Sequence, residues 1–218
     1  MKKRIILIVV LLAVLGVCIT LAKNTMLSGG QLFLTGSVIA GNGGMKIGHA
    51  DISEKGTING SRGDSTGKEV TICDWYDGGW QICLRPKSTT LAENSADACE
   101  EGCANANIGY GQADRNSAYQ SYKASCKMSR IEKSNVDDFS FMTLCAIAGG
   151  CKNLEYKGNA PTTSTMRKAF EATGDYEVLR DEKYLTTTEY LRRGDILVKE
   201  GGHTVMVLTN GKEANKKR

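Results

Sequence analysis

The chain has little proline and little histidine, with two residues of each among 218. Two prolines exclude a proline-rich linker protein, and the composition is not collagen-like although it includes 25 glycines. Two histidines and no Cys-x-x-Cys motif argue against a structural zinc site. The sequence is 41% hydrophobic and 24% charged, without internal repeats, which is typical of an ordinary globular domain.

A basic stripe of the kind that binds nucleic acid is also missing. The net charge is +4, but seven of the 28 basic residues lie at the two ends of the chain. Without those seven and Glu213, 21 basic residues remain against 23 acidic ones. Nucleic-acid-binding domains cluster Lys and Arg on one folded surface. We therefore expect no nucleic acid among the partners.

The first 22 residues have the pattern of an export segment. Three cations, Lys2 to Arg4, precede 18 uncharged and mostly apolar residues, Ile5 to Ala22. That length lies between a long signal-peptide core and a short membrane helix, so cleaved signal peptide and membrane anchor both remain open. Because positive charge stays on the cytoplasmic side, we expect the rest of the chain outside the cytoplasm, membrane-tethered or secreted.

Composition then divides the remaining chain into three parts. Residues 23–44 are a Gly-rich linker, residues 45–211 are one domain, and residues 212–218 are a basic tail. Of the eight cysteines, Cys18 lies in the export segment and seven lie in the exported body. An odd number of cysteines outside the cytoplasm predicts one free thiol.

Hydrophobic spacing and capping residues predict four helices, two hairpins and one helical turn. The helices are expected at residues 90–103, 112–126, 137–149 and 162–174, with the turn at residues 188–193. The hairpins are expected at residues 70–84, where Cys73 and Cys83 could face each other, and 195–209. Helices first and a compact antiparallel sheet last predict an α+β domain.

Three segments resemble a known family when they are taken together. They are Asp137–Cys145 at a helix start, Tyr190–Leu197 entering a strand, and Gly202–Leu208 in the next strand. This combination resembles the NlpC/P60-type, CHAP-like cysteine peptidases, and among them the endolysins of phages and prophages. Met45–Asp51 and Gly63–Val70 are similar to the opening of such lysins.

The resemblance implies a papain-like NlpC/P60 fold, in which N-terminal helices pack on a small antiparallel sheet. It implies hydrolysis of the stem peptides of bacterial peptidoglycan, with no cofactor and no metal. The family's nucleophile is a cysteine at a helix N-terminus, where the helix dipole favours the thiolate. A histidine on the adjacent strand acts as base and then acid, and a third polar group orients it.

In this chain His203 falls on the family's histidine, but Asp138 occupies the nucleophile position. Aspartate there is a favoured helix-capping residue and a far poorer nucleophile than a thiolate. Cys145 lies about 10 Å further along the helix, so it does not replace the missing thiol. Asn210 is a weak candidate for orienting His203.

Other polar and aromatic residues leave alternatives open. His49 with Asp51 and Glu54 either lines the cleft or binds a metal. Four aromatic residues are candidates for contacting a glycan or peptide, although packing across strands is the commoner role of such rings. They are Tyr110, Trp75, Tyr76 and Trp80.

The sequence thus supports three functional hypotheses. The first is a cell-wall hydrolase of cysteine-peptidase type whose activity is weak or lost because of Asp138. The second is a non-catalytic module that keeps the cleft, pairs Asp138 with His203 and binds peptidoglycan. The third is a membrane-anchored interaction protein in which the fold is only a scaffold.

Overall fold

The computed structural model describes residues 44–154, 156 and 158–214. The export segment, almost all of the linker and the last four residues of the basic tail lie outside this described part. Within it, the domain combines a six-stranded sheet, a two-stranded sheet and four α-helices, which confirms the α+β prediction.

The main sheet is antiparallel and draws strands from both ends of the domain. Its order is β2-β1-β8-β7-β3-β6. The strands are β1 (Lys46–Ala50), β2 (Val70–Asp74), β3 (Ile82–Pro86), β6 (Tyr176–Leu179), β7 (Ile196–Val198) and β8 (Thr204–Val207). The small sheet pairs two parallel strands, β4 (Ile108–Tyr110) and β5 (Ser134–Val136).

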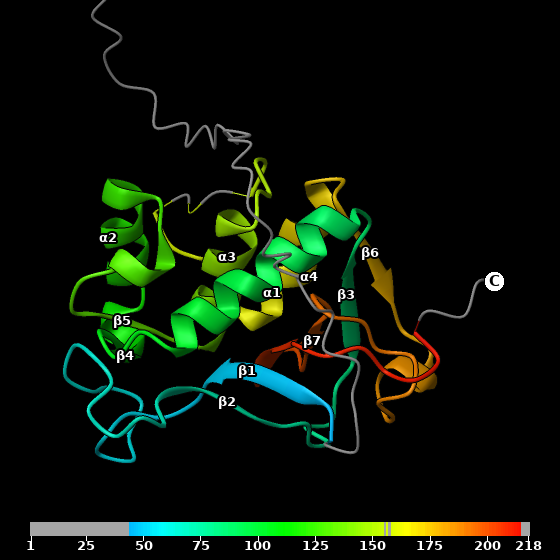
Figure 1. Ribbon diagram of the computed structural model, residues 1–218, viewed down its shortest axis with the longest axis horizontal. Helices are drawn as coiled ribbons and strands as arrows, with labels where there is room; N and C mark the ends of the chain where they lie inside the picture. The colour runs from blue at the N-terminus through cyan, green and yellow to red at the C-terminus, as the bar shows by residue number, and fades with distance from the viewer. Residues whose placement is uncertain (1–43, 155, 157, 215–218) are drawn as a thin grey trace, which may run out of the picture. The chain divides into compact units, whose positions relative to one another are not determined.

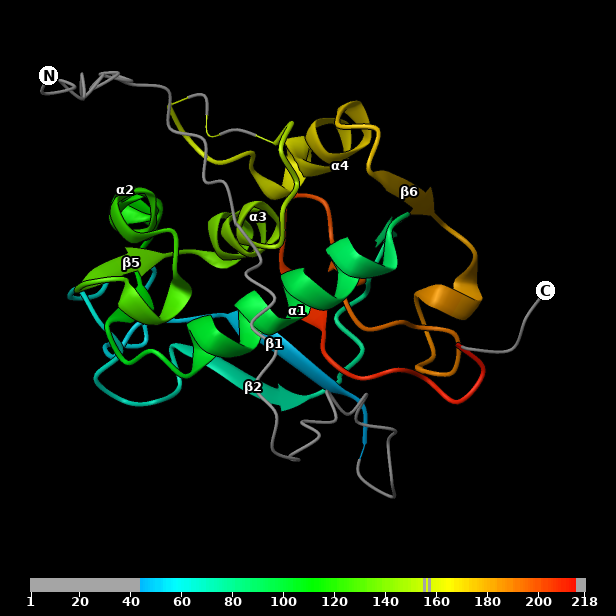
Figure 2. The same ribbon diagram turned by 45° about the horizontal axis from the view of Figure 1, so that its top comes forward.

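In the chain, the four α-helices come after β3 and before β6. They are α1 (Thr89–Cys103), α2 (Ser117–Ser125), α3 (Asp138–Ala148) and α4 (Thr163–Ala172). Three 3-10 turns complete the elements: η1 (Gln112–Asp114), η2 (Met128–Arg130) and η3 (Glu182–Tyr184). Figures 1 and 2 show α2 with β5 at one end and α4 with β6 at the other, with α1 and α3 between them.

Both faces of the inner strands of the main sheet are buried, because their side chains alternate between two apolar clusters, whereas the edge strands β2 and β6 carry exposed residues. In β7, Ile196 and Val198 pack into the cluster that contains the helices, whereas Leu197 packs into the second cluster. The second cluster also contains Leu185 and Leu191 from the connection between β6 and β7. The central strands are therefore almost entirely apolar.

Local signals located most of the helices and one hairpin correctly. The helices predicted at residues 90–103, 137–149 and 162–174 are confirmed as α1, α3 and α4. The predicted hairpin at residues 195–209 is confirmed as the pair β7 and β8. The helix expected at residues 112–126 is shorter, because η1 occupies its first residues and α2 begins only at Ser117.

The predicted hairpin at residues 70–84 is wrong. β2 pairs with β1, and β3 pairs with β6 and β7, so three strands separate β2 from β3. Cys73 and Cys83 consequently do not face each other, and both thiols are free. The Asp77-Gly78-Gly79 sequence makes a local Asx-type hydrogen bond, in which the Gly79 amide donates to the Asp77 carboxylate at 2.9 Å. A local bond alone does not pair the flanking strands when each can bury more surface against another partner.

Two smaller expectations are also corrected. The order of helices first and sheet last is wrong, since β1, β2 and β3 precede α1. Residues 188–193 form turns without a helix. The α+β class survives because it depends on antiparallel pairing and segregated helices rather than on their order in the chain.

Candidate functional site

Two aspartates, Asp137 and Asp138, stand at the N-terminus of α3. Asp137 is the N-cap, and its carboxylate accepts from the Ser140 amide at 3.0 Å. The Ser140 hydroxyl accepts in return from the Asp137 amide at 2.8 Å, which completes a capping box. Asp138 follows directly, in the first turn where the helix dipole favours negative charge.

His203 lies beside this carboxylate. Its Nδ1 is 3.4 Å from Oδ2 of Asp138, and the Asp138 side chain is only 6% exposed. His203 immediately precedes β8, so the approach joins a helix N-terminus to the start of a sheet strand. In the described part of the chain, the other ring nitrogen of His203, Nε2, is buried and has no hydrogen-bond partner. The structure therefore brings the two central predicted site residues within reach of each other.

His49 on β1 is the second histidine of this site. Its ring centroid is 5.8 Å from that of His203, in an edge-on arrangement. The His49 ring nitrogens contact Sγ of Cys73 at 3.6 Å and the Tyr76 hydroxyl at 3.4 Å. Burial lowers the pKa of His49, and the nearby His203 lowers it further. The sequence singled out His49 but gave no sign of Cys73 or Tyr76 as its neighbours.

Of the predicted aromatic residues, Trp80 and Tyr110 are buried, whereas Trp75 is only partly buried. The Trp80 ring lies 6.2 Å from His203 but is 5% exposed, and its Nε1 donates to the Tyr76 carbonyl. Tyr110 is 4% exposed, and burial raises its pKa to about 12. Trp75 packs against the second apolar cluster. Tyr76, at 36%, is the exposed ring beside the histidines.

Asn210 does not join this group of side chains. Its Oδ1 accepts from the Arg193 amide at 2.9 Å. Asn210 follows β8 whereas His203 precedes it, so the four-residue strand, about 13 Å long, lies between them. No contact joins the side chain of Asn210 to the ring of His203 in the part of the domain described here.

None of the free thiols in the described residues occupies the position of the family's nucleophile. Cys145 on α3 is fully buried. It packs with Cys99 and Cys103 in the apolar cluster that contains the helices. Burial raises the pKa of Cys145. Cys73 contacts His49 rather than His203, and burial followed by the Asp74 charge raises its pKa. These environments favour the protonated thiol, the less reactive form.

Two further findings concern the whole described part of the chain. Within it, no three or more His, Cys, Asp or Glu side chains are arranged to hold a metal ion. The same residues contain no helix with the length and apolar character needed to cross a membrane.

Fold and site together define an α+β domain in which a helix N-terminus holds a carboxylate against a histidine from the central sheet. A family model described as endolysin-like domain matches residues 47–214. The chain belongs to this family, whose description suggests a cell-wall hydrolase-like role with peptidoglycan as the substrate. No curated protein and no solved structure matches the chain.

Proposed function

We propose that this domain is an NlpC/P60-type relative of the cysteine peptidases that binds peptidoglycan stem peptides without cleaving them by thiol chemistry. The observation that carries the proposal is the 3.4 Å approach of Asp138 to His203 at the N-terminus of α3. A thiolate at this position would be stabilised by the helix dipole and would use the imidazole as its proton acceptor.

The carboxylate changes the chemistry of this position in two ways. It is a much weaker nucleophile toward an amide carbonyl than a thiolate, so no acyl-enzyme intermediate is expected to form. It also pairs with His203 when the imidazole is protonated, which holds the ring in place. The carboxylate and the imidazole together form a polar pair at the helix N-terminus that can bind polar groups of a peptide.

The decisive experiment restores the thiol. Purified wild-type protein and Asp138→Cys are incubated with purified peptidoglycan, and newly released amino groups are measured. We expect release from Asp138→Cys and none from wild type. That release should be slow, because Nε2 of His203 lacks the partner that would orient the ring. The matched control is Asp138→Asn, which removes the charge without adding a nucleophile and should be inactive.

Wild-type protein that cleaves as fast as Asp138→Cys would contradict the loss of thiol chemistry. Retention on insoluble peptidoglycan then separates binding from scaffolding. A binding module is retained, whereas a membrane-anchored interaction protein is not. Failure of wild type and Asp138→Asn alike to sediment with peptidoglycan would overturn the proposed binding role.

A second candidate function follows from the unpartnered Nε2 of His203. Asp138 Oδ2 and His203 Nε2 are both buried and without a hydrogen-bond partner among the described residues, so this candidate requires a local rearrangement that lets Asp138 accept from Nδ1–H and opens Nε2 to a water molecule. The water oxygen would attack the amide carbonyl carbon, and the same proton would pass to the leaving nitrogen. This candidate predicts slow cleavage by wild type that both Asp138→Asn and His203→Gln abolish.

The export segment, the linker and the extracytoplasmic location are part of the same proposal. They rest on the three cations and 18 uncharged residues that open the chain. A reporter that is active only outside the cytoplasm, fused after residue 44, tests them. Loss of reporter activity after Lys2, Lys3 and Arg4 are replaced by glutamate supports export through this segment.

A further inference from the structure

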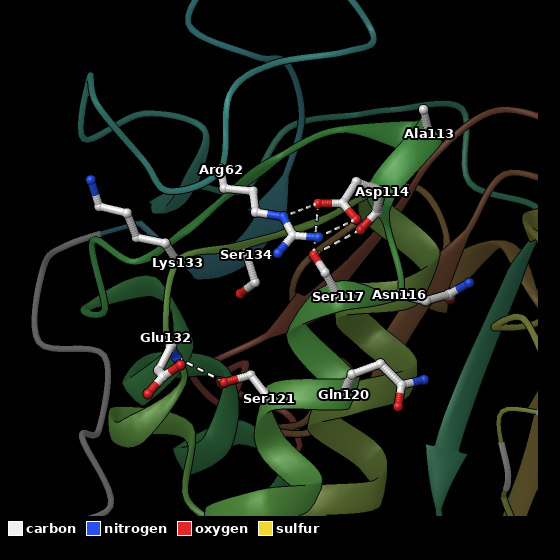
Figure 3. A pocket seen from close by; sticks show the side chains of 10 residues that line it. All are labelled: Arg62, Ala113, Asp114, Asn116, Ser117, Gln120, Ser121, Glu132, Lys133 and Ser134. Atoms are coloured by element: carbon white, nitrogen blue, oxygen red, sulfur yellow. Dashed lines mark hydrogen bonds and ion pairs between the residues drawn. The ribbon is translucent and has the colours of Figure 1, made fainter.

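A cavity of about 400 Å³ lies between α2, η1 and the segment that leads into β5. Figure 3 shows its side chains, which are almost all polar. Ser134, at the start of β5, contributes to its wall, and Asp138 lies four residues further along the chain. Four extended residues span about 13 Å, so the cavity lies within one short peptide length of the site at α3.

One wall of the cavity contains a bidentate ion pair between exposed side chains. Nε and Nη2 of Arg62 donate to the two oxygens of Asp114 at 2.6 Å and 3.0 Å. The Ser117 hydroxyl donates to the same carboxylate at 3.0 Å. These three bonds occupy Asp114, whereas Nη1 of Arg62 makes no hydrogen bond to the described residues. A guanidinium nitrogen remains available on this wall.

The remaining wall carries polar groups that have no partner of their own. Gln120, Glu132 and Lys133 are exposed, and their side chains make no hydrogen bond or ion pair to the described residues, so they are free to contact a ligand. The Ser134 hydroxyl is also unpartnered, although the residue is only 1% exposed. In Figure 3 that hydroxyl points toward the space between Arg62 and Ser121. Buried hydroxyls normally have a partner, so the Ser134 hydroxyl is a donor that a water molecule or a bound polar group can satisfy.

We propose that this cavity binds the carboxylate-bearing end of a short polar peptide. Lys133 and the free nitrogen of Arg62 supply cationic donors for the carboxylate. Glu132 supplies an anion for a peptide amino group, and Ser134 and Gln120 bond the backbone. The wall includes no aromatic side chain on which the face of a sugar could pack. Identification of this peptide with a peptidoglycan stem rests on the proposed function, whereas the peptide chemistry does not.

The test measures binding of a synthetic tripeptide, L-alanyl-γ-D-glutamyl-L-lysine, to the full domain by calorimetry. Lys133→Gln and Ser134→Ala should each weaken binding, the lysine change by about tenfold because it removes a charge-assisted bond. The matched control is Lys127→Gln, an exposed lysine outside the cavity, which should leave the affinity unchanged. The tripeptide with its carboxylates amidated should bind as weakly to wild type as the free tripeptide does to Lys133→Gln.

Ser134→Ala also separates binding from folding. Removing an unpartnered buried hydroxyl should leave the melting temperature unchanged or raise it. Three results overturn the proposal: no binding of the tripeptide to wild type, unchanged affinity in both cavity variants, or preferential binding of N-acetylglucosamine oligosaccharides. Sedimentation with intact peptidoglycan distinguishes the two proposals. If both cavity variants still sediment with peptidoglycan, the cavity is not the peptide site, but the proposed function stands. If wild-type protein does not sediment with peptidoglycan, the proposed function itself is contradicted.

Discussion

His49 shows how burial and a like charge act together on one residue. The side chain is 8% exposed, and both ring nitrogens have protein neighbours. Burial disfavours the charged ring, and the adjacent His203 opposes a second positive charge. The nearby Asp51 acts in the opposite direction but less strongly. The ring is therefore neutral over most of the physiological pH range and can hold the thiol of Cys73 and the hydroxyl of Tyr76.

This lowered pKa has a measurable consequence for stability. The unfolded chain binds the proton at the ordinary value, about 6.5, whereas the folded chain binds it only at lower pH. The contribution of His49 to stability is therefore complete above that value and is lost as the pH falls below it. His49→Gln should reduce the loss of stability between pH 7 and pH 5, measured by urea unfolding, while His203 is kept as the control histidine. Imidazole resonances of His49 that titrate above 6.5 would contradict this.

The N-terminus of α3 is the element that combines capping with the site. Asp137 caps the helix, and the helix dipole and the Ser140 amide both favour its charged form. Burial nevertheless prevails and raises the pKa of Asp137 to about 6, with a further rise from the charge of Asp138. Ionisation of this buried cap therefore costs the folded state free energy at neutral pH.

The replacement Asp137→Asn keeps the cap and removes the charge. Relative to the variant, the wild-type protein should lose stability as the pH rises from about 4 to about 6, because its folded state binds the Asp137 proton more tightly than the unfolded chain. The variant should lack this loss, which is on the order of 2 kcal/mol. Unfolding by urea at pH 4 and pH 7 measures the difference. Asp181→Asn, at an exposed carboxylate, is the control and should follow wild type.

At the scale of the whole molecule, the main sheet is assembled from segments that are far apart in the chain. β1 lies between β2 and β8, and β3 lies between β7 and β6. A buried ion pair joins the same segments, since Nη2 of Arg85 is 2.6 Å from Oδ2 of Asp195, 110 residues away. Nη2 also donates to the Tyr190 carbonyl at 2.9 Å. The two ends of the domain are thus one folding unit.

Asp195→Ala should destabilise the domain by about 3–5 kcal/mol, because it leaves the guanidinium of Arg85 buried and uncompensated. The exposed pair Lys46–Asp74, at 2.7 Å, also joins two parts of the chain and provides a matched control. Asp74→Ala should cost less than about 1 kcal/mol, since solvent screens that pair. If urea unfolding gives the same loss of unfolding free energy for both variants, burial does not make the Arg85–Asp195 pair more important for stability than the exposed pair.

The sequence alone determined the features that depend on neighbouring residues. Capping residues and hydrophobic spacing were enough to locate α1, α3 and α4, and two glycines between apolar runs were enough for the hairpin of β7 and β8. The resemblance also placed Asp138 and His203 at one site, and the structure brings them together.

Only the tertiary structure decided which strands pair and which side chains meet. The Asp77-Gly78-Gly79 sequence predicts a hairpin, but β2 and β3 each pair with other strands of the sheet. The contacts of His49 with Cys73 and Tyr76 depend on the same pairing, as does the separation of Asn210 from His203. These features arise from burial between segments far apart in the chain, which local propensity does not encode.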